Sequence, residues 1–178
     1  MVQSYIERIL NAQVYDVARE TPLDAAPLLS ARLANQAFLK REDLQPVFSF
    51  KCRGAYNKMV HLDEAARAGG VVAASAGNHA QGVALAASKL GIKATIVMPV
   101  TTPLIKVDAV KALGAKVVMH GDSFDEAAVR ARALTESEGF TFIHPFDDPD
   151  VIAGQGTVAV ELVRQAQQPL DYVFVCCG

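Results

Sequence analysis

The sequence has no tryptophan and only three cysteines among its 178 residues. Two of these, Cys176 and Cys177, are adjacent and the third is Cys52, a pattern that suits a reducing cytoplasm better than a disulfide framework. Long hydrophobic runs are also missing, because none approaches the ~20 residues that a membrane helix needs. Glu7 and Arg8 interrupt the apolar N-terminal stretch. We therefore expect a cytoplasmic protein without a signal peptide or membrane contact.

Charge of one sign is not in excess, since 17 Lys and Arg face 19 Asp and Glu. Nucleic-acid binding needs a clustered surplus of basic residues, so we expect no nucleic-acid partner. The histidines His61, His120 and His144 lack the spacing of metal ligands. We expect structural roles for them and no metal site. With 51% apolar residues, the composition is that of a globular protein with a sizeable core.

Short β-branched runs alternate with longer helical patterns along most of the chain. The pattern predicts strands over residues 71–74, 94–98, 116–119, 141–143 and 172–175, and helices over residues 78–90, 103–113, 123–138 and 149–167. Ser123 and Glu126 have the spacing of a capping box at the start of one of these helices. Helices that separate continuously apolar strands are typical of a parallel sheet. The fold class is therefore predicted to be α/β.

The loop 75–79 is a candidate binding site, because it joins a predicted strand to a predicted helix. Its sequence, Ser-Ala-Gly-Asn-His, is rich in small residues, and free N–H groups at a helix N-terminus bind anions. A plain capped turn explains the same residues, with Gly77 supplying an unusual backbone conformation and Asn78 acting as N-cap. Spacing alone leaves both interpretations open.

Two glycine patterns resemble nucleotide-binding motifs but do not meet their requirements. Residues 154–159 fit the dinucleotide fingerprint, yet no strand runs directly into them. We expect these small residues to let a helix pack closely on a neighbour instead. Residues 77–82 have the glycine spacing of a phosphate loop, but Val83 and Ala84 stand where Lys and Ser or Thr are required.

A second candidate site lies around Lys51. Ser49 is a plausible N-cap, which places Lys51 and Arg53 in the first turn of a helix. Cations are unfavourable at that end of the helix dipole, so the pair indicates an anionic ligand nearby. A lysine in such a place can have a lowered pKa and act as nucleophile or base. Cys52, beside it, is expected to be a packing residue.

Several segments resemble the threonine deaminases (threonine ammonia-lyases), and the similarity covers essentially the whole chain. The matching segments are residues 39–43, 49–56, 75–82, 106–109 and 151–157. The resemblance implies an enzyme of fold type II, similar to the tryptophan synthase β subunit, that depends on pyridoxal 5′-phosphate (PLP). Residues 45–48 and 55–59 favour the long, biosynthetic form that opens isoleucine synthesis.

The resemblance also implies roles for individual residues. Lys51 would be the Schiff-base lysine and the group that removes the substrate α-proton, while Phe50 packs beside the cofactor ring and Asn78 bonds its 3′-oxygen. The residues expected around the substrate carboxylate are Ser75, Ala76, Gly77, Asn78 and His79. The implied reaction converts L-threonine to 2-oxobutanoate and ammonia, with the cofactor ring as electron sink.

Two departures from the family qualify these expectations. Ala76 stands where the related serine racemases carry a serine that acts as a base, so elimination is expected over racemisation. The family's glycine-rich phosphate loop follows the position of Cys176, Cys177 and Gly178, so residues 1–178 alone are expected to be catalytically inactive. The alternatives are therefore an incompetent fragment of such an enzyme, or a dehydratase that also accepts L-serine.

The resemblance divides the chain into two parts. Residues 1–69 and 147–178 would belong to an incomplete large domain, and residues 70–146 to a small, mobile domain. The full-length form is expected to be a homo-oligomer.

Overall fold

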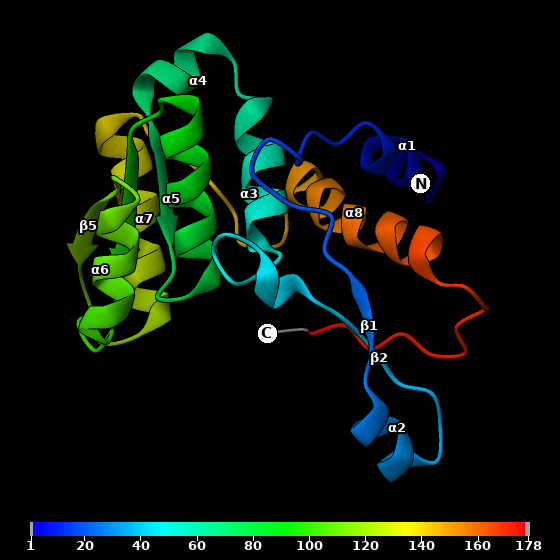
Figure 1. Ribbon diagram of the computed structural model, residues 1–178. Coiled ribbons are helices and arrows are strands. Elements are labelled where there is room, and N and C mark those ends of the chain that lie inside the picture. Colours follow the sequence, from blue (N-terminus) through cyan, green and yellow to red (C-terminus); the bar gives the residue numbers. More distant parts are fainter. Residues whose placement is uncertain (1, 177–178) are drawn as a thin grey trace.

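The computed structural model describes the backbone of residues 2–176 and the side chains of residues 5–176. Cys177 and Gly178, named in the sequence analysis, lie outside the described residues. The chain forms a parallel sheet covered by helices on both faces, with a helical region and a projecting hairpin beside it (Figure 1).

The central sheet has four parallel strands in the order β5-β4-β3-β6. They are β3 (Val71–Ala74), β4 (Ala94–Met98), β5 (Lys116–Met119) and β6 (Thr141–Phe142). The helices α5 (Asn78–Leu90), α6 (Leu104–Ala112) and α7 (Phe124–Glu138) alternate with them. The predicted α/β class and parallel pairing are confirmed. Helix α6 is one residue shorter at each end than predicted, and β6 ends one residue earlier.

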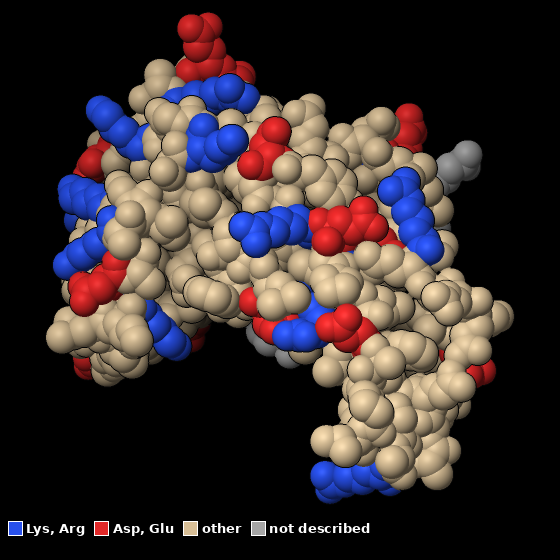
Figure 2. All heavy atoms as spheres, viewed as in Figure 1, with Lys and Arg blue, Asp and Glu red and all other residues tan. Residues whose placement is uncertain are grey.

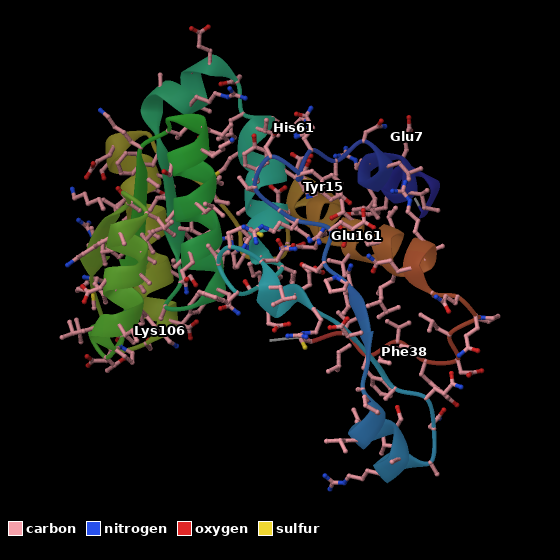
Figure 3. The ribbon with its side chains drawn as sticks, in the orientation of Figure 1. Glu7, Tyr15, Phe38, His61, Lys106 and Glu161 are labelled. Atoms are coloured by element: carbon pink, nitrogen blue, oxygen red, sulfur yellow. The ribbon has the colours of Figure 1, made fainter. Side chains whose placement is uncertain are left out.

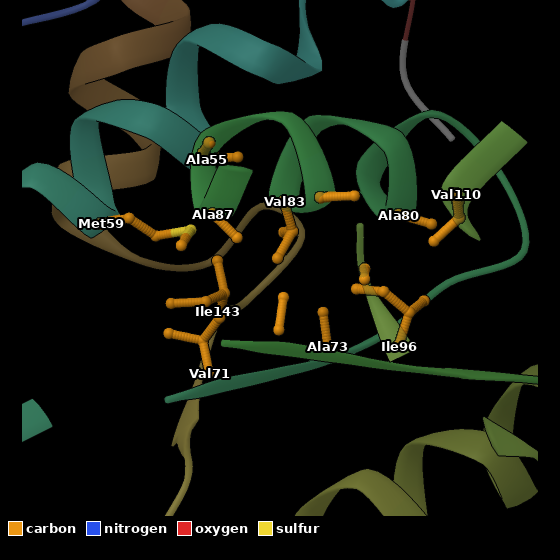
Figure 4. Close-up of a cluster of buried hydrophobic side chains, with 14 of the residues drawn as sticks. Ala55, Met59, Val71, Ala73, Ala80, Val83, Ala87, Ile96, Val110 and Ile143 are labelled. Atoms are coloured by element: carbon orange, nitrogen blue, oxygen red, sulfur yellow. The ribbon is translucent and has the colours of Figure 1, made fainter. Parts of the chain in front are cut away.

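The two faces of the sheet bury different side chains, because successive residues of a strand point to opposite sides. Val71 and Ala73 of β3 pack against α3, α5 and α6 in the larger core cluster, where Met59, Val83 and Ile96 are also buried (Figure 4). The residues that alternate with these along the strands face α7. The cluster on that side comprises Val72, Ala74, Val97, Ala127, Ala131 and Leu134. Strands buried on both faces explain the continuously apolar runs in the sequence.

Helix α7 begins with the predicted serine cap. The Ser123 hydroxyl accepts a hydrogen bond from the Glu126 N–H at 3.3 Å. The return bond of the capping box differs, because the Glu126 carboxylate accepts from the Asp122 N–H rather than from the N–H of Ser123.

Helix α3 (Lys51–Val60) lies between α5 and α8 (Pro149–Gln165), and glycines make both contacts close (Figure 1). A Cβ atom on Gly82 of α5 would come within 2.9 Å of the Lys51 carbonyl oxygen. One on Gly154 of α8 would come within 2.6 Å of the Arg53 carbonyl oxygen. The structure therefore confirms that residues 154–159 serve close helix packing.

Gly154→Ala is expected to destabilise the protein by about 1–3 kcal/mol, because its new methyl group would meet the α3 backbone, which has no room to move. This loss should outweigh the ~1 kcal/mol that alanine gains over glycine in a helix. Gly156→Ala is the matched control, since the atoms nearest its Cβ belong to the Ile9 side chain rather than to a helix backbone. Urea unfolding of both variants measures the difference, and equal stabilities would contradict this explanation.

The remaining elements are short and were not predicted. They are α1 (Val2–Leu10), β1 (Leu23–Ala25), α2 (Pro27–Leu33), β2 (Phe38–Lys40), the 3₁₀ helix η1 (Glu42–Leu44) and α4 (Glu64–Gly69). Strands β1 and β2 pair antiparallel, and α2 projects between them as an arm that is mostly uncharged on the face shown in Figure 2. Elsewhere on that face acidic and basic side chains are interspersed.

The predicted strand over residues 172–175 is wrong. The chain there has no regular secondary structure and pairs with no described strand, and Phe174 is 93% exposed. A strand needs a neighbour to satisfy its N–H and C=O groups, which a β-branched sequence alone cannot supply. Helix α8 ends at Gln165, two residues before its predicted end. No helix in the part of the chain that is described has the length and apolarity required to cross a membrane.

Candidate active site

The two candidate segments come together at the carboxyl ends of β3 and β6. Lys51 is the first residue of α3, and the loop 75–77 leads from β3 into α5. The loop 143–147 contacts both: Lys51 Nζ donates to the Pro145 carbonyl at 3.0 Å, and the His79 ring contacts the Ile143 carbonyl at 2.9 Å. This edge of a parallel sheet is where ligands of α/β proteins bind.

Lys51 has the environment of a reactive amine. Its side chain is half-buried, and Nζ lies 5.5 Å from the centroid of the Phe50 ring. Burial lowers the pKa of Lys51 below its ordinary value, because the charged form loses hydration. No carboxylate forms an ion pair with Lys51 among the described side chains. The environment thus increases the share of free amine at neutral pH.

The start of α3 differs from the prediction at one residue. Phe50, not Ser49, is the N-cap, and no side chain caps the helix. The Ser49 hydroxyl instead accepts weakly from the Lys51 N–H at 3.4 Å. Phe50 has helical backbone angles at this position, which hold its ring next to the Lys51 amine.

The loop after β3 keeps an open helix N-terminus. Gly77 is the N-cap of α5, and Asn78 is the first helical residue rather than the predicted N-cap. Because glycine has no side chain, no side-chain hydrogen bond caps the helix. Gly77 has φ −139° and ψ −140°, neither helical nor extended, which is the unusual backbone conformation that the capped-turn interpretation expected. The Ser75 hydroxyl accepts from the Gly77 N–H at 3.2 Å, Ala76 is half-buried and Asn78 is exposed. The first N–H groups of α5 have no acceptor within the helix, which favours an anion there.

His79 is held in one neutral form. The residue is buried, with 4% of its surface exposed. A carbonyl only accepts, so Nε2 carries the proton that it donates to the Ile143 oxygen. Nδ1 then presents a lone pair, and it has no partner among the described groups. The pKa of His79 is lowered to about 4, chiefly by burial; the hydrogen bond to the Ile143 carbonyl raises it, and the nearby Lys51 and His144 lower it.

His144 and Pro145 also belong to this region, although the sequence analysis assigned neither to the site. The His144 ring accepts from the Asp147 N–H at 2.7 Å and lies edge-on to Phe146 at 4.7 Å. These contacts shape the loop in which the Pro145 carbonyl accepts the hydrogen bond from the Lys51 amine. Both residues follow a strand that is adjacent to β3, a position that could have flagged them.

Arg53 does not face an anionic ligand, and that interpretation of the sequence is wrong. Its side chain is completely buried and turned toward α8, where Nη1 lies 2.6 Å from Glu161 Oε1. Its Nε lies 2.8 Å from Glu42 Oε2. The charge opposed to the helix dipole is thus compensated by two carboxylates of the protein itself.

Two further expectations concern cysteine and metals. Cys52 is fully buried in a small apolar cluster, and burial raises the pKa of its thiol to about 11, in keeping with a packing role. Among the described residues, no three His, Cys, Asp or Glu side chains are grouped as metal ligands would be.

Comparison with known proteins places the chain in a family. A family described as pyridoxal-phosphate dependent enzymes matches residues 14–178. The biosynthetic L-threonine dehydratase of Burkholderia multivorans is 58% identical over 177 residues, which are 98% of this chain and 35% of that protein. The biosynthetic chloroplastic threonine dehydratase of Arabidopsis thaliana is 62% identical over 98% of this chain and 29% of its own length. The chain thus spans about a third of the length of the curated relatives it matches.

Solved structures agree with the sequence relatives. The processed form of threonine deaminase isoform 2 from Solanum lycopersicum superposes with a TM-score of 0.88 at 55% identity, covering 92% of this chain and 48% of that one. Maize serine racemase gives 0.86 at 36% identity, covering 90% and 49%. These similarities confirm the fold-type II class and the resemblance to biosynthetic threonine deaminases. The chain belongs to the family of pyridoxal-phosphate dependent enzymes.

Proposed function

We propose that this chain carries the catalytic lysine of a PLP-dependent deaminase that converts L-threonine to 2-oxobutanoate and ammonia. The observation that carries the proposal is the position of Lys51: a half-buried amine of lowered pKa that donates to the loop 143–147, which also contacts the first turn of α5 at the ligand-binding edge of the sheet. The names of the relatives, threonine dehydratase and threonine deaminase, supply the substrate class.

The residues present fit the cofactor. Lys51 offers an amine to an aldehyde, and the Phe50 ring offers an apolar surface beside it. The unpartnered, buried Nδ1 of His79 indicates a polar group that is completed by a ligand. When bound, PLP supplies an electron sink for charge that develops at the substrate α-carbon.

The chain's own residues would then divide the work as follows. The Lys51 Nζ takes the substrate α-proton, and the Pro145 carbonyl orients that amine. The N–H groups at the start of α5 hold the substrate carboxylate, and the exposed amide of Asn78 bonds the cofactor's 3′-oxygen. His79 enters this arrangement as a neutral acceptor, so the attraction for the carboxylate comes from the helix N-terminus rather than from an imidazolium.

We also infer that residues 70–146 move as a small domain relative to residues 1–69 and 147–178. The parallel sheet and its helices fall within the first range, and α3 and α8 fall within the second. The loop 143–147 sits at the boundary, so a movement of the sheet would change the surroundings of Lys51. Oligomeric association of the whole protein belongs to the same proposal.

The Ala76 methyl group bears on the alternative of serine chemistry. The similarity to maize serine racemase raises L-serine as a further substrate. Ala76→Ser, made in a complete catalytic domain, is expected to add measurable formation of D-serine, because a hydroxyl can exchange a proton where a methyl cannot. Chiral chromatography of the product measures it. A structure with the new Oγ near the substrate α-carbon, together with no D-serine, would contradict the idea.

Reductive labelling tests the proposed function without requiring turnover. The protein is mixed with PLP, treated with borohydride and digested, and the modified lysine is located by mass spectrometry. We expect the pyridoxyl group on Lys51. Lys58, which lies on the same helix and is half-buried but paired with Asp148 at 2.9 Å, is the internal control. Labelling of Lys58 in preference to Lys51 would overturn the proposal.

A further inference from the structure

A buried group of charges lies on the other side of α3 from Lys51. It consists of Lys40, Glu42, Arg53 and Glu161, and we call it the charge cluster. Arg53 and Glu161 have no exposed surface. Their pairing is bidentate, with Nη1 2.6 Å from Oε1 and Nη2 3.0 Å from Oε2. Lys40 Nζ lies 2.6 Å from Glu161 Oε2, so two cations balance two carboxylates.

The hydrogen bonds of the cluster are complete. The Arg53 guanidinium donates to Glu42, Glu161, the Thr157 hydroxyl and the Arg19 carbonyl. Glu161 also accepts from the Tyr15 hydroxyl at 3.0 Å, and Figure 3 shows these two side chains beside each other. A fully satisfied buried network holds one arrangement, since any displacement leaves a buried polar group unpaired.

The cluster joins the two helices that determine the surroundings of Lys51. Residues two positions apart on a helix point roughly 200° apart, so Arg53 anchors the side of α3 opposite to Lys51. Glu161 lies on α8, and α8 follows the loop that supplies the Pro145 carbonyl to Lys51. The contact of Gly54 with Gly154 between these helices leaves no side-chain layer that could absorb a shift.

Stability alone is a weak explanation for these charges. Well-packed apolar side chains often replace a buried ion pair without loss of stability. What an apolar pair does not supply is a fixed register, because only the guanidinium fork and the carboxylate require two parallel hydrogen bonds. Burial raises the pKa of Glu161, but the hydrogen bonds from Arg53 and Lys40 outweigh this effect and hold the pKa below its ordinary value. The carboxylate is therefore charged.

We propose that Arg53 and Glu161 are positioning residues for Lys51. Their pairing fixes the position of α3 relative to α8, so that the Lys51 amine remains hydrogen-bonded to the Pro145 carbonyl and shielded from water. The proposal rests on the role of Lys51 in the proposed function. It assigns no contact with substrate or cofactor to the charge cluster itself.

The test measures the amine of Lys51 directly, with no cofactor present. The protein is pulsed with acetic anhydride at a series of pH values, and acetylation of Lys51 is quantified by mass spectrometry against exposed Lys89 in the same sample. The variants are Arg53→Lys, which keeps the charge but loses the fork, and the double variant Arg53→Met, Glu161→Met. Melting temperature is recorded for each. His79 and His144, the titratable groups beside Lys51, are unchanged in both.

In both variants we expect the midpoint of Lys51 acetylation to rise by about half a pH unit or more, which is about a threefold loss of free amine near neutral pH. The double variant should keep a melting temperature close to that of the parent protein, which separates positioning from stability. Phe50→Ala, which exposes the amine, shows that the assay responds. Arg41→Lys, in an exposed ion pair with Asp24 and Asp43, should change nothing.

An unchanged midpoint in Arg53→Lys and the double variant, with a shift in Phe50→Ala, would overturn the proposal. If both charge variants fail to fold, Tyr15→Phe is the deciding variant, because it removes only one hydrogen bond from Glu161. A rise in its Lys51 acetylation midpoint, smaller than that expected for the charge variants, supports the proposal. An unchanged midpoint contradicts it. A wrong proposed function would give a different result. In the reductive labelling experiment the pyridoxyl group would then appear on a lysine other than Lys51, regardless of the acetylation results for the Arg53 variants.

Discussion

Lys51→Ala is expected to abolish the visible absorbance of lysine-bound PLP and to lower the rate of threonine deamination by at least 10²–10⁴-fold, the usual cost of losing a proton-transfer group. The physical reason is that no other described lysine is half-buried and donates to the loop 143–147, and that burial lowers the pKa of this amine. Absorbance is followed on mixing with PLP, and 2-oxobutanoate is measured in a polypeptide with a complete catalytic domain.

Lys58→Ala is the matched control, because Lys58 shares the helix and its half-buried character but pairs with Asp148 and Asp150. It is expected to retain absorbance and turnover. A Lys51→Ala protein that keeps the absorbance band of the parent would rule out Lys51 as the cofactor lysine. Loss of absorbance in both variants would point to a change in fold instead.

The sheet and its covering helices could be predicted because each carries a local signal. Val71–Ala74 and Ala94–Met98 are short apolar runs that end at a small residue or proline, and Ser123 caps α7. Between residues 20 and 45 such signals are absent: β1 and β2 have three residues each, and none of these residues is buried. Their pairing depends on contacts distant in sequence, which periodicity does not contain.

The candidate site was only partly visible in the sequence. Lys51 and the loop 75–79 were found because each begins a helix, but their meeting through Pro145 depends on β6 lying beside β3. Arg53 was misinterpreted because its partners are distant in sequence, at Glu42 and Glu161. A signal did exist: Glu161 continues the buried face of α8 that Val151, Gly154 and Thr157 define at helical spacing. An acidic residue on such a face implies a buried partner.

The buried histidine of the site gives the second large effect. His79 has a pKa of about 4 in the folded protein, chiefly because burial disfavours its charged form, against an ordinary value of 6.5 in the unfolded chain. Between pH 6.5 and about 4 the unfolded chain therefore binds a proton on His79 that the folded protein does not bind. The free energy of unfolding must fall as the pH falls through this range, and the contribution of His79 is fully present only above it.

His79→Gln is expected to remove this dependence, because the glutamine amide can donate to the Ile143 carbonyl and does not titrate. From the 2.5-unit difference between 6.5 and about 4, His79 accounts for a loss of about 3 kcal/mol of stability between pH 7 and pH 4. Urea unfolding of the parent protein and the variant at half-unit pH intervals measures it, with His120→Gln, an exposed histidine, as the control. If the parent protein and His79→Gln lose the same stability on acidification, the pKa of His79 is not lowered in the folded protein, and below pH 6.5 its ring is not held as a neutral acceptor.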